Sequence, residues 1–175
     1  FEDLEILNLD FSRNDSISDK SITQLSQTLL NLTLLKSLGI SFSKSPHITD
    51  KGIFKLSNSI SSLNTESLKL VFIECPNIRE NGASSIFQKL KNIPGLRKLN
   101  LNFSMNPNIN SNTIQILSES LAVLPKLELL NLNFSECSKI QDEGISKLFS
   151  CLRHRNLGIL ALNFSKCEKI SNKGI

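Results

Sequence analysis

The chain has few of the side chains that usually build catalytic or metal-binding sites. Its 175 residues include no Trp, no Tyr, one Met and two His. Neither His47 nor His154 stands at the spacing of a metal site or of a nucleophile–base pair. Carboxylates do not pair at a fixed spacing, and the seven glycines form no Gly-rich phosphate loop. We therefore expect no enzyme activity, no cofactor, no metal site and no small-molecule substrate.

Long apolar runs and a strong charge imbalance are missing too. No run approaches the roughly 20 residues that a membrane-spanning helix needs, and no signal peptide is visible. The formal net charge is +4, from 20 basic and 16 acidic residues. A nucleic-acid-binding surface usually has clustered basic charge instead. The composition therefore argues against membrane and nucleic-acid partners.

What the chain does contain is a repeat marked by phenylalanine. Six of the ten Phe recur at intervals of 30 or 31 residues. A fixed period of this length is typical of a solenoid, in which each copy packs on its neighbours. The six residues are Phe11, Phe42, Phe72, Phe103, Phe134 and Phe164.

Each copy opens with an alternating segment. In the fifth copy Leu130, Leu132 and Phe134 are apolar, whereas the residues between them are polar. A period of two predicts a strand with one buried face. Three residues after each Phe comes a small side chain that can donate a hydrogen bond, and we expect this column to bond backbone carbonyls in the turn. The column consists of Asn14, Ser45, Cys75, Asn106, Cys137 and Cys167.

The second half of each copy has helical spacing. Ile145, Leu148 and Leu152 fall on one helical face. A residue that can cap a helix precedes each such face. A small residue follows the cap, and it is Gly in four copies, which indicates a close approach between neighbouring helices. The predicted caps are Asp19, Asp50, Glu80, Ser111, Asp142 and Asn172, and the glycines are Gly52, Gly82, Gly144 and Gly174.

The combined pattern, L-x-L-x-F-S-x-[CN]-x-x-I-x-x-x-G-I-x-x-L, resembles the leucine-rich repeat family. Its period and full helix are similar to the ribonuclease-inhibitor-like class. Its Cys column is similar to the cysteine-containing class common in F-box proteins, and its Leu-Asn-Phe-Ser strand is similar to repeat arrays of ciliated protozoa. The resemblance implies an α/β fold: a β/α solenoid with a parallel sheet on the concave face and helices on the convex face. The general rule for parallel crossovers predicts that it is right-handed.

The domain organisation follows from counting copies. Residues 1–175 make one solenoid segment of five full repeats and the strand half of a sixth. Phe1 lies just before a strand, and Ile175 lies where the sixth helix should begin. Terminal repeats normally carry a polar outer face, and neither end has one. We therefore expect that the segment belongs to a longer array or that another chain covers its ends.

The four cysteines indicate a reducing environment. Cys137 and Cys167 occupy one column in adjacent copies, about 5 Å apart for paired strands. A disulfide between them stays open as an alternative, but the column favours buried, reduced thiols. Cys151 is expected on the outward side of a helix. This usage predicts an intracellular, cytoplasmic location.

The outward side of the strands is the best candidate for a binding surface. Curvature makes such a surface an extended concave groove. Its many Asn and Ser side chains suit adaptable hydrogen bonding to a polypeptide, and its few apolar residues are candidate anchors. The predicted partner-binding residues are Asn8, Asp10, Ser41, Lys69, Val71, Ile73, Lys98, Asn100, Asn102, Leu129, Asn131, Asn133, Ile159 and Asn163.

These features favour a non-catalytic scaffold that binds a protein partner through its concave face and rim loops, within a multi-subunit assembly. Four alternatives stay open. The first is that the face is only solvated, and the second is that the segment is the substrate-recognition module of an F-box-type ubiquitin ligase. The third is a ribonucleoprotein subunit that contacts RNA through lysines of the rim or the convex side, and the fourth is an accessory module attached to a catalytic domain outside this segment.

Overall fold

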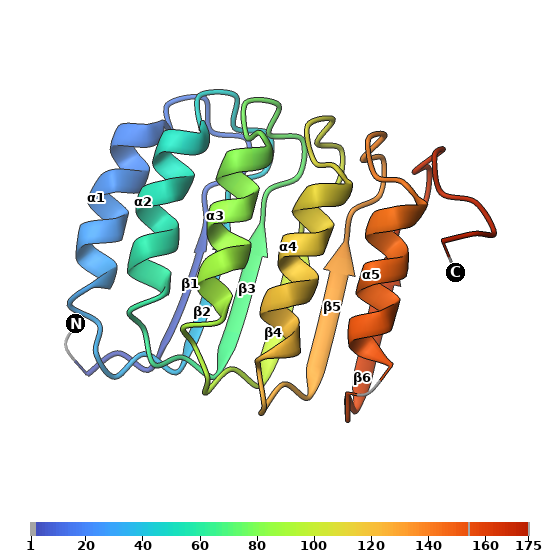
Figure 1. The fold of residues 1–175 in the computed structure, drawn as a ribbon. Coiled ribbons are helices and arrows are strands. Elements are labelled where there is room, and N and C mark those ends of the chain that lie inside the picture. Colours follow the sequence, from blue (N-terminus) through green and yellow to red (C-terminus); the bar gives the residue numbers. More distant parts are fainter. Residues whose placement is uncertain (1–2, 154, 175) are drawn as a thin grey trace.

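The computed structural model describes residues 3–153 and 155–174, so Phe1, Glu2, His154 and Ile175 lie outside the described residues. In this part of the chain, six strands form one sheet in chain order, and a helix follows each of the first five (Figure 1). The strands are β1 (Ile6–Asp10), β2 (Ser37–Ser41), β3 (Ser67–Val71), β4 (Lys98–Asn102), β5 (Leu129–Asn133) and β6 (Ile159–Asn163). The helices are α1 (Asp19–Leu29), α2 (Asp50–Ile60), α3 (Glu80–Leu90), α4 (Ser111–Ala122) and α5 (Asp142–Leu152).

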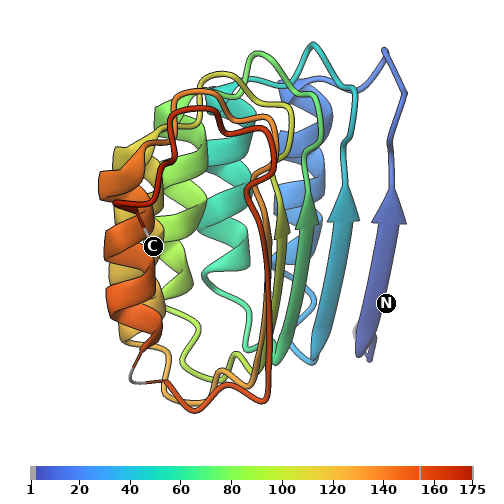
Figure 2. The same cartoon turned by 90° about the vertical axis from the view of Figure 1, so that its right-hand side faces the viewer.

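All strand pairs are parallel and in the register set by the repeat. Leu130 of β5 lies opposite Leu99 of β4 and Leu160 of β6. The helices form one layer and the strands form the other (Figure 2). The architecture is therefore the predicted right-handed β/α solenoid, with the sheet on the concave face and the helices on the convex face.

The six repeated phenylalanines form a continuous column behind the sheet. Neighbouring ring centroids are 5.2 to 6.1 Å apart along it. Phe87 of α3 adds an edge-on contact to Phe103 at 5.2 Å and to Phe134 at 6.1 Å. Edge and offset arrangements at these distances are favourable for aromatic pairs. Phe134 is fully buried, which confirms the inward assignment of this column.

The column of small donors bonds the turn of the preceding repeat, as predicted. The Cys137 thiol donates to the carbonyl oxygen of Phe103 at 3.2 Å. The Asn106 side chain donates to Phe72 O at 2.6 Å, and its Oδ1 accepts from the backbone N–H of Cys75 at 2.9 Å. Two members depart from the pattern. Asn14, in the first repeat, is exposed, and its Oδ1 accepts from the Ser16 backbone N–H at 3.0 Å. The buried Ser45 hydroxyl has no hydrogen-bond partner among the described residues.

The prediction of helix caps is wrong by one position. The predicted caps Asp19, Asp50, Glu80, Ser111 and Asp142 are the first residues of their helices, and Asn172 precedes no helix within the described residues. Their side chains bond to the next repeat instead. Asp50 Oδ1 accepts from the backbone N–H of Arg79 at 2.7 Å, and Ser111 Oγ accepts from that of Gln141 at 2.9 Å. The caps themselves are Ser18, Thr49, Arg79, Asn110 and Gln141.

The glycines at the helix starts mark the expected close approach. A Cβ added at Gly82 would lie 2.4 Å from Asp50 Oδ1 and 3.1 Å from Asp50 Cα. A Cβ at Gly144 would lie 2.9 Å from Ser111 Cα. Adjacent helices therefore pack at a distance that leaves no room for a side chain at these positions.

All four cysteines are free. Burial raises the pKa of the Cys75 and Cys167 thiols, and that of Cys137 to about 12. The prediction for Cys151 is wrong, because this residue is half-buried and its thiol donates to Ser118 O of α4 at 3.1 Å. Among the described residues, no helix is long and apolar enough to cross a membrane.

Candidate functional site

The concave face is built from alternate strand residues whose side chains point away from the helices. Parallel register stacks these residues into columns that run across the sheet. One column crosses the carboxyl ends of the strands and is called the strand-end column below. It consists of Asp10, Ser41, Val71, Asn102, Asn133 and Asn163.

All 14 predicted partner-binding residues lie on this face. Lys69 and Lys98 are exposed, and Asn100 and Asn131 are half-buried between neighbouring strands. The predicted apolar anchors differ from one another in exposure. Ile159 is 56% exposed, whereas Val71, Ile73 and Leu129 are half-buried. The sheet thus brings the predicted residues onto one surface, spread over all six strands.

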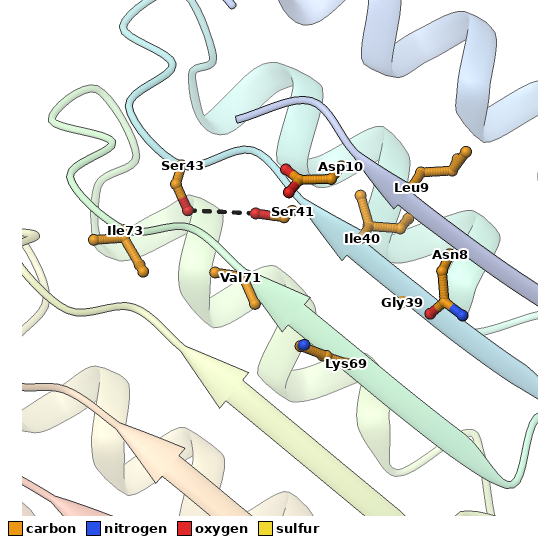
Figure 3. A pocket seen from close by; sticks show the side chains of 10 residues that line it. All are labelled: Asn8, Leu9, Asp10, Gly39, Ile40, Ser41, Ser43, Lys69, Val71 and Ile73. Atoms are coloured by element: carbon orange, nitrogen blue, oxygen red, sulfur yellow. Dashed lines mark hydrogen bonds between the residues drawn. The ribbon is translucent and has the colours of Figure 1, made fainter. Parts of the chain in front are cut away.

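A depression of about 430 Å³ hollows this face over β1, β2 and β3 (Figure 3). Charged side chains flank it on two strands, with Asp10 on β1 and Lys69 on β3, and Val71 and Ile73 supply its apolar wall. Asn8, Leu9, Gly39, Ile40, Ser41 and Ser43 complete the lining. A shallow site with one charge of each sign and an apolar wall can hold a polypeptide side chain.

Gly39 and Ser43 belong to this depression but were not among the predicted site residues. Gly39 lies between Asn8 and Lys69 in a second column of outward residues. It has no side chain, and the Asn8 carboxamide lies over it. A Cβ at Gly39 would lie 2.2 Å from Asn8 Oδ1. A single Gly in a column of larger residues is the sequence signal that could have located the depression.

Asp10 is held as a carboxylate at the edge of the depression. Its Oδ1 accepts from the Ser12 backbone N–H at 2.9 Å. The side chain and the backbone N–H of Ser12 lower the pKa of Asp10, and the charge of Lys69 acts in the same direction. Ser12 and Ser41 join their hydroxyls at 2.6 Å, so this edge is a fixed polar network.

Three asparagines of the strand-end column make the same turn as Asp10. The Oδ1 atoms of Asn102, Asn133 and Asn163 each accept from the backbone N–H two residues later, at 3.1, 3.0 and 3.0 Å. Asn and Asp commonly bond their own backbone in this way. Each oxygen therefore uses one of its two acceptor positions in the turn. Asn102 Oδ1 uses the second as well, because it also accepts from the Ser104 hydroxyl at 2.8 Å.

The rim above the strands has an unusual backbone. One non-Gly residue in each repeat has a positive φ, between 55° and 62°, a region that L residues seldom adopt. Two ion pairs connect these residues across repeats, Lys44–Glu74 at 3.2 Å and Lys166–Glu136 at 2.9 Å. The six residues are Arg13, Lys44, Glu74, Met105, Glu136 and Lys166.

Comparisons with known proteins support the fold, but they support no particular family or function. No protein-family model matches the chain, and no curated protein matches it. A solved structure of a tropomodulin C-terminal domain from Caenorhabditis elegans superposes with a TM-score of 0.58, covering 87% of this chain and 84% of that one. That domain has a leucine-rich repeat fold, and this chain shares it. The sequence identity is 12%, so the likeness shows the fold alone.

Proposed function

We propose that the chain is a non-catalytic scaffold whose concave face and rim loops hold a protein partner in a multi-subunit assembly. The observation that carries the proposal is the depression over β1–β3, where Asp10, Lys69, Val71 and Ile73 converge on a face that also carries many side-chain amides and hydroxyls. The strands under this face are paired in register throughout, so a partner meets a preorganised surface. Preorganisation lowers the entropic cost of binding.

The absence of catalysis is also proposed, and the state of the thiols supports it. A reactive cysteine needs a lowered pKa and access to solvent. Cys75, Cys137 and Cys167 are buried, and burial raises the pKa of each. These thiols stabilise the fold by donating to backbone carbonyls.

We propose a reducing, intracellular location for the same reason. A disulfide would remove the S–H donors of Cys137 and Cys167, which bond Phe103 O and Phe134 O at 3.2 and 3.1 Å. The ladder therefore needs reduced thiols. The cysteine-containing class and the ciliate arrays stay predictions, since they rest on the residue pattern.

The test is affinity capture with the full-length protein from its native cells, followed by mass spectrometry. Asn131→Arg places a long cation in the centre of the concave face, and the Asn131 side chain makes no hydrogen bond within the described residues. Asn81→Arg, at an exposed position of α3 on the convex side, adds the same charge as a control.

We expect Asn131→Arg to lose a protein that the wild type and Asn81→Arg both retain. Equal capture by all three proteins would contradict the proposal. The retained proteins would also separate the alternatives, because ubiquitin-ligase subunits would indicate substrate recognition. Salt-sensitive capture of RNA would indicate a ribonucleoprotein.

A further inference from the structure

We infer that the concave face binds an extended segment with a defined polarity. In the bound segment, acidic residues lie over β4–β6, and an apolar residue lies against Val71 and Ile73. This inference rests on the proposed function and gives the partner its chemistry. Its main support is the orientation of three side-chain amides in the strand-end column.

The turns fix which end of each amide faces the groove. A backbone N–H can be satisfied only by an acceptor, so Oδ1 of Asn102, Asn133 and Asn163 must face the N–H of Ser104, Ser135 and Ser165. The NH₂ group of each amide is then turned outward. Three neighbouring strands therefore present hydrogen-bond donors in one row.

Asp10 shows the opposite chemistry at the other end of the same column. Its Oδ1 makes the same turn to Ser12, but its outward atom is a second carboxylate oxygen, which only accepts. The strand-end column thus changes from an anionic acceptor on β1, through the apolar Val71 on β3, to donors on β4–β6. A partner must match this order along its length.

The charges near the donor row agree with an acidic ligand. Lys98 on β4 and Lys69 on β3 are exposed on the same face, and the outward residues of these strands include no carboxylate. Glu136 on the rim above β5 is paired with Lys166 at 2.9 Å. Carboxylates lying over β4–β6 would therefore meet the amide donors, with Lys98 at the other end of β4 on the same face and with Glu136 already paired to Lys166.

The spacing of the strands sets the length of the segment. Neighbouring strands are about 4.8 Å apart, so β3 to β6 spans about 14 Å, and an extended chain rises about 3.3 Å per residue. A segment of four or five residues therefore covers the apolar wall and the donor row. Each hydrogen bond to a charged group adds specificity for acid over amide.

The test is selection of a phage-displayed library of random dodecapeptides on the folded chain. The variant N102D/N133D keeps both turns, because Asp10 already makes this turn, but replaces two outward donors with anionic acceptors. The control N81D/N92D changes the net charge by the same amount at exposed positions on and after α3. Asn131→Arg, which blocks the face itself, is the third protein.

The wild type is expected to enrich peptides in which an apolar residue lies beside Asp or Glu within a stretch of four or five residues. Synthetic copies should bind N102D/N133D about tenfold more weakly by fluorescence anisotropy, and N81D/N92D within about twofold. Two results would overturn the proposed order of apolar and acidic residues: enriched peptides without an excess of Asp and Glu, or equal peptide affinity for the two double variants. Neither result would contradict the proposed scaffold function. Peptide binding that Asn131→Arg leaves unchanged would overturn both proposals.

Discussion

The carboxylate of Asp19, in the first turn of α1, holds Thr49 of the next repeat. Asp19 Oδ1 accepts from the Thr49 backbone N–H at 2.8 Å, and Oδ2 accepts from its hydroxyl at 2.6 Å. Asp142 bonds Ser171 through the same pair of contacts, both at 2.6 Å. Each carboxylate also lies at a helix N-terminus, where the helix dipole favours negative charge. These residues therefore stabilise the stacking of repeats as well as single helices.

Asp19→Ala tests this link between repeats. The substitution removes two hydrogen bonds to a charged acceptor, and we expect it to lower the free energy of unfolding by about 1–3 kcal/mol. Urea denaturation followed by circular dichroism measures the change. Asp15→Ala is the matched control, since Asp15 is exposed and its carboxylate makes no hydrogen bond within the described residues. Equal stability of the two variants would show that the link contributes nothing.

Gly82→Ala tests the close approach of helix starts. The new methyl group would overlap Asp50, with its Cβ 2.4 Å from Oδ1 and 3.1 Å from the backbone Cα. We expect a loss of about 1–3 kcal/mol in unfolding free energy, because the helix must shift. At Gly95 the nearest atom to an added Cβ is Asn64 Oδ1 at 3.5 Å, an ordinary contact. Gly95→Ala should therefore change stability little, and a penalty as large as that of Gly82→Ala would contradict the packing argument.

Ser45→Cys repairs the one unsatisfied member of the donor column. The Ser45 hydroxyl is buried without a partner, whereas the Cys75 thiol donates to Phe42 O at 3.2 Å. The longer C–S bond should let the thiol at residue 45 reach Phe11 O. We therefore expect the free energy of unfolding, measured by thermal or chemical denaturation, to rise by about 1 kcal/mol. Ser45→Ala removes the unsatisfied hydroxyl together with its desolvation cost, so this variant should be at least as stable as the wild type. A cysteine variant less stable than Ser45→Ala would show that the thiol finds no acceptor.

Alkaline pH should destabilise the fold through Cys137. Burial raises its pKa from 9.0 to about 12, so between these values the folded state keeps a proton that the unfolded state releases. The unfolding free energy therefore falls as pH rises above 9 and is unaffected below it. Cys137→Ala removes this contribution and should show a shallower decline between pH 8 and 11, measured by urea denaturation. Identical slopes for the two proteins would rule out a buried, protonated thiol.

The sequence predicts most of the fold because each repeated position has the same neighbours. Phe134, Leu130 and Ile145 are buried as the two periods require. The approach at Gly82 and the donor role of Cys137 also follow from columns of equivalent residues. A pattern that recurs every 30 or 31 residues reports contacts between repeats as well as contacts within them.

Interactions that depend on a one-residue offset could not be predicted in this way. Asp50 satisfies the rule for a cap, but its helix begins at Asp50 itself, so its carboxylate reaches Arg79 of the next repeat. Cys151 sits between α4 and α5 because neighbouring helices lie close enough for its thiol to reach Ser118. Alternation likewise places Asn133 on the concave face without showing that its oxygen is bonded to Ser135.

Site-specific photocrosslinking tests the central claim, that the concave face is the binding surface, most directly. A benzophenone amino acid at position 100 would replace Asn100 in the centre of the concave face, and one at position 54 would replace Phe54, which is 52% exposed on the convex side. With full-length protein in its native cells, we predict an adduct with a partner protein from position 100 and none from position 54. An adduct from position 54 alone would contradict the account.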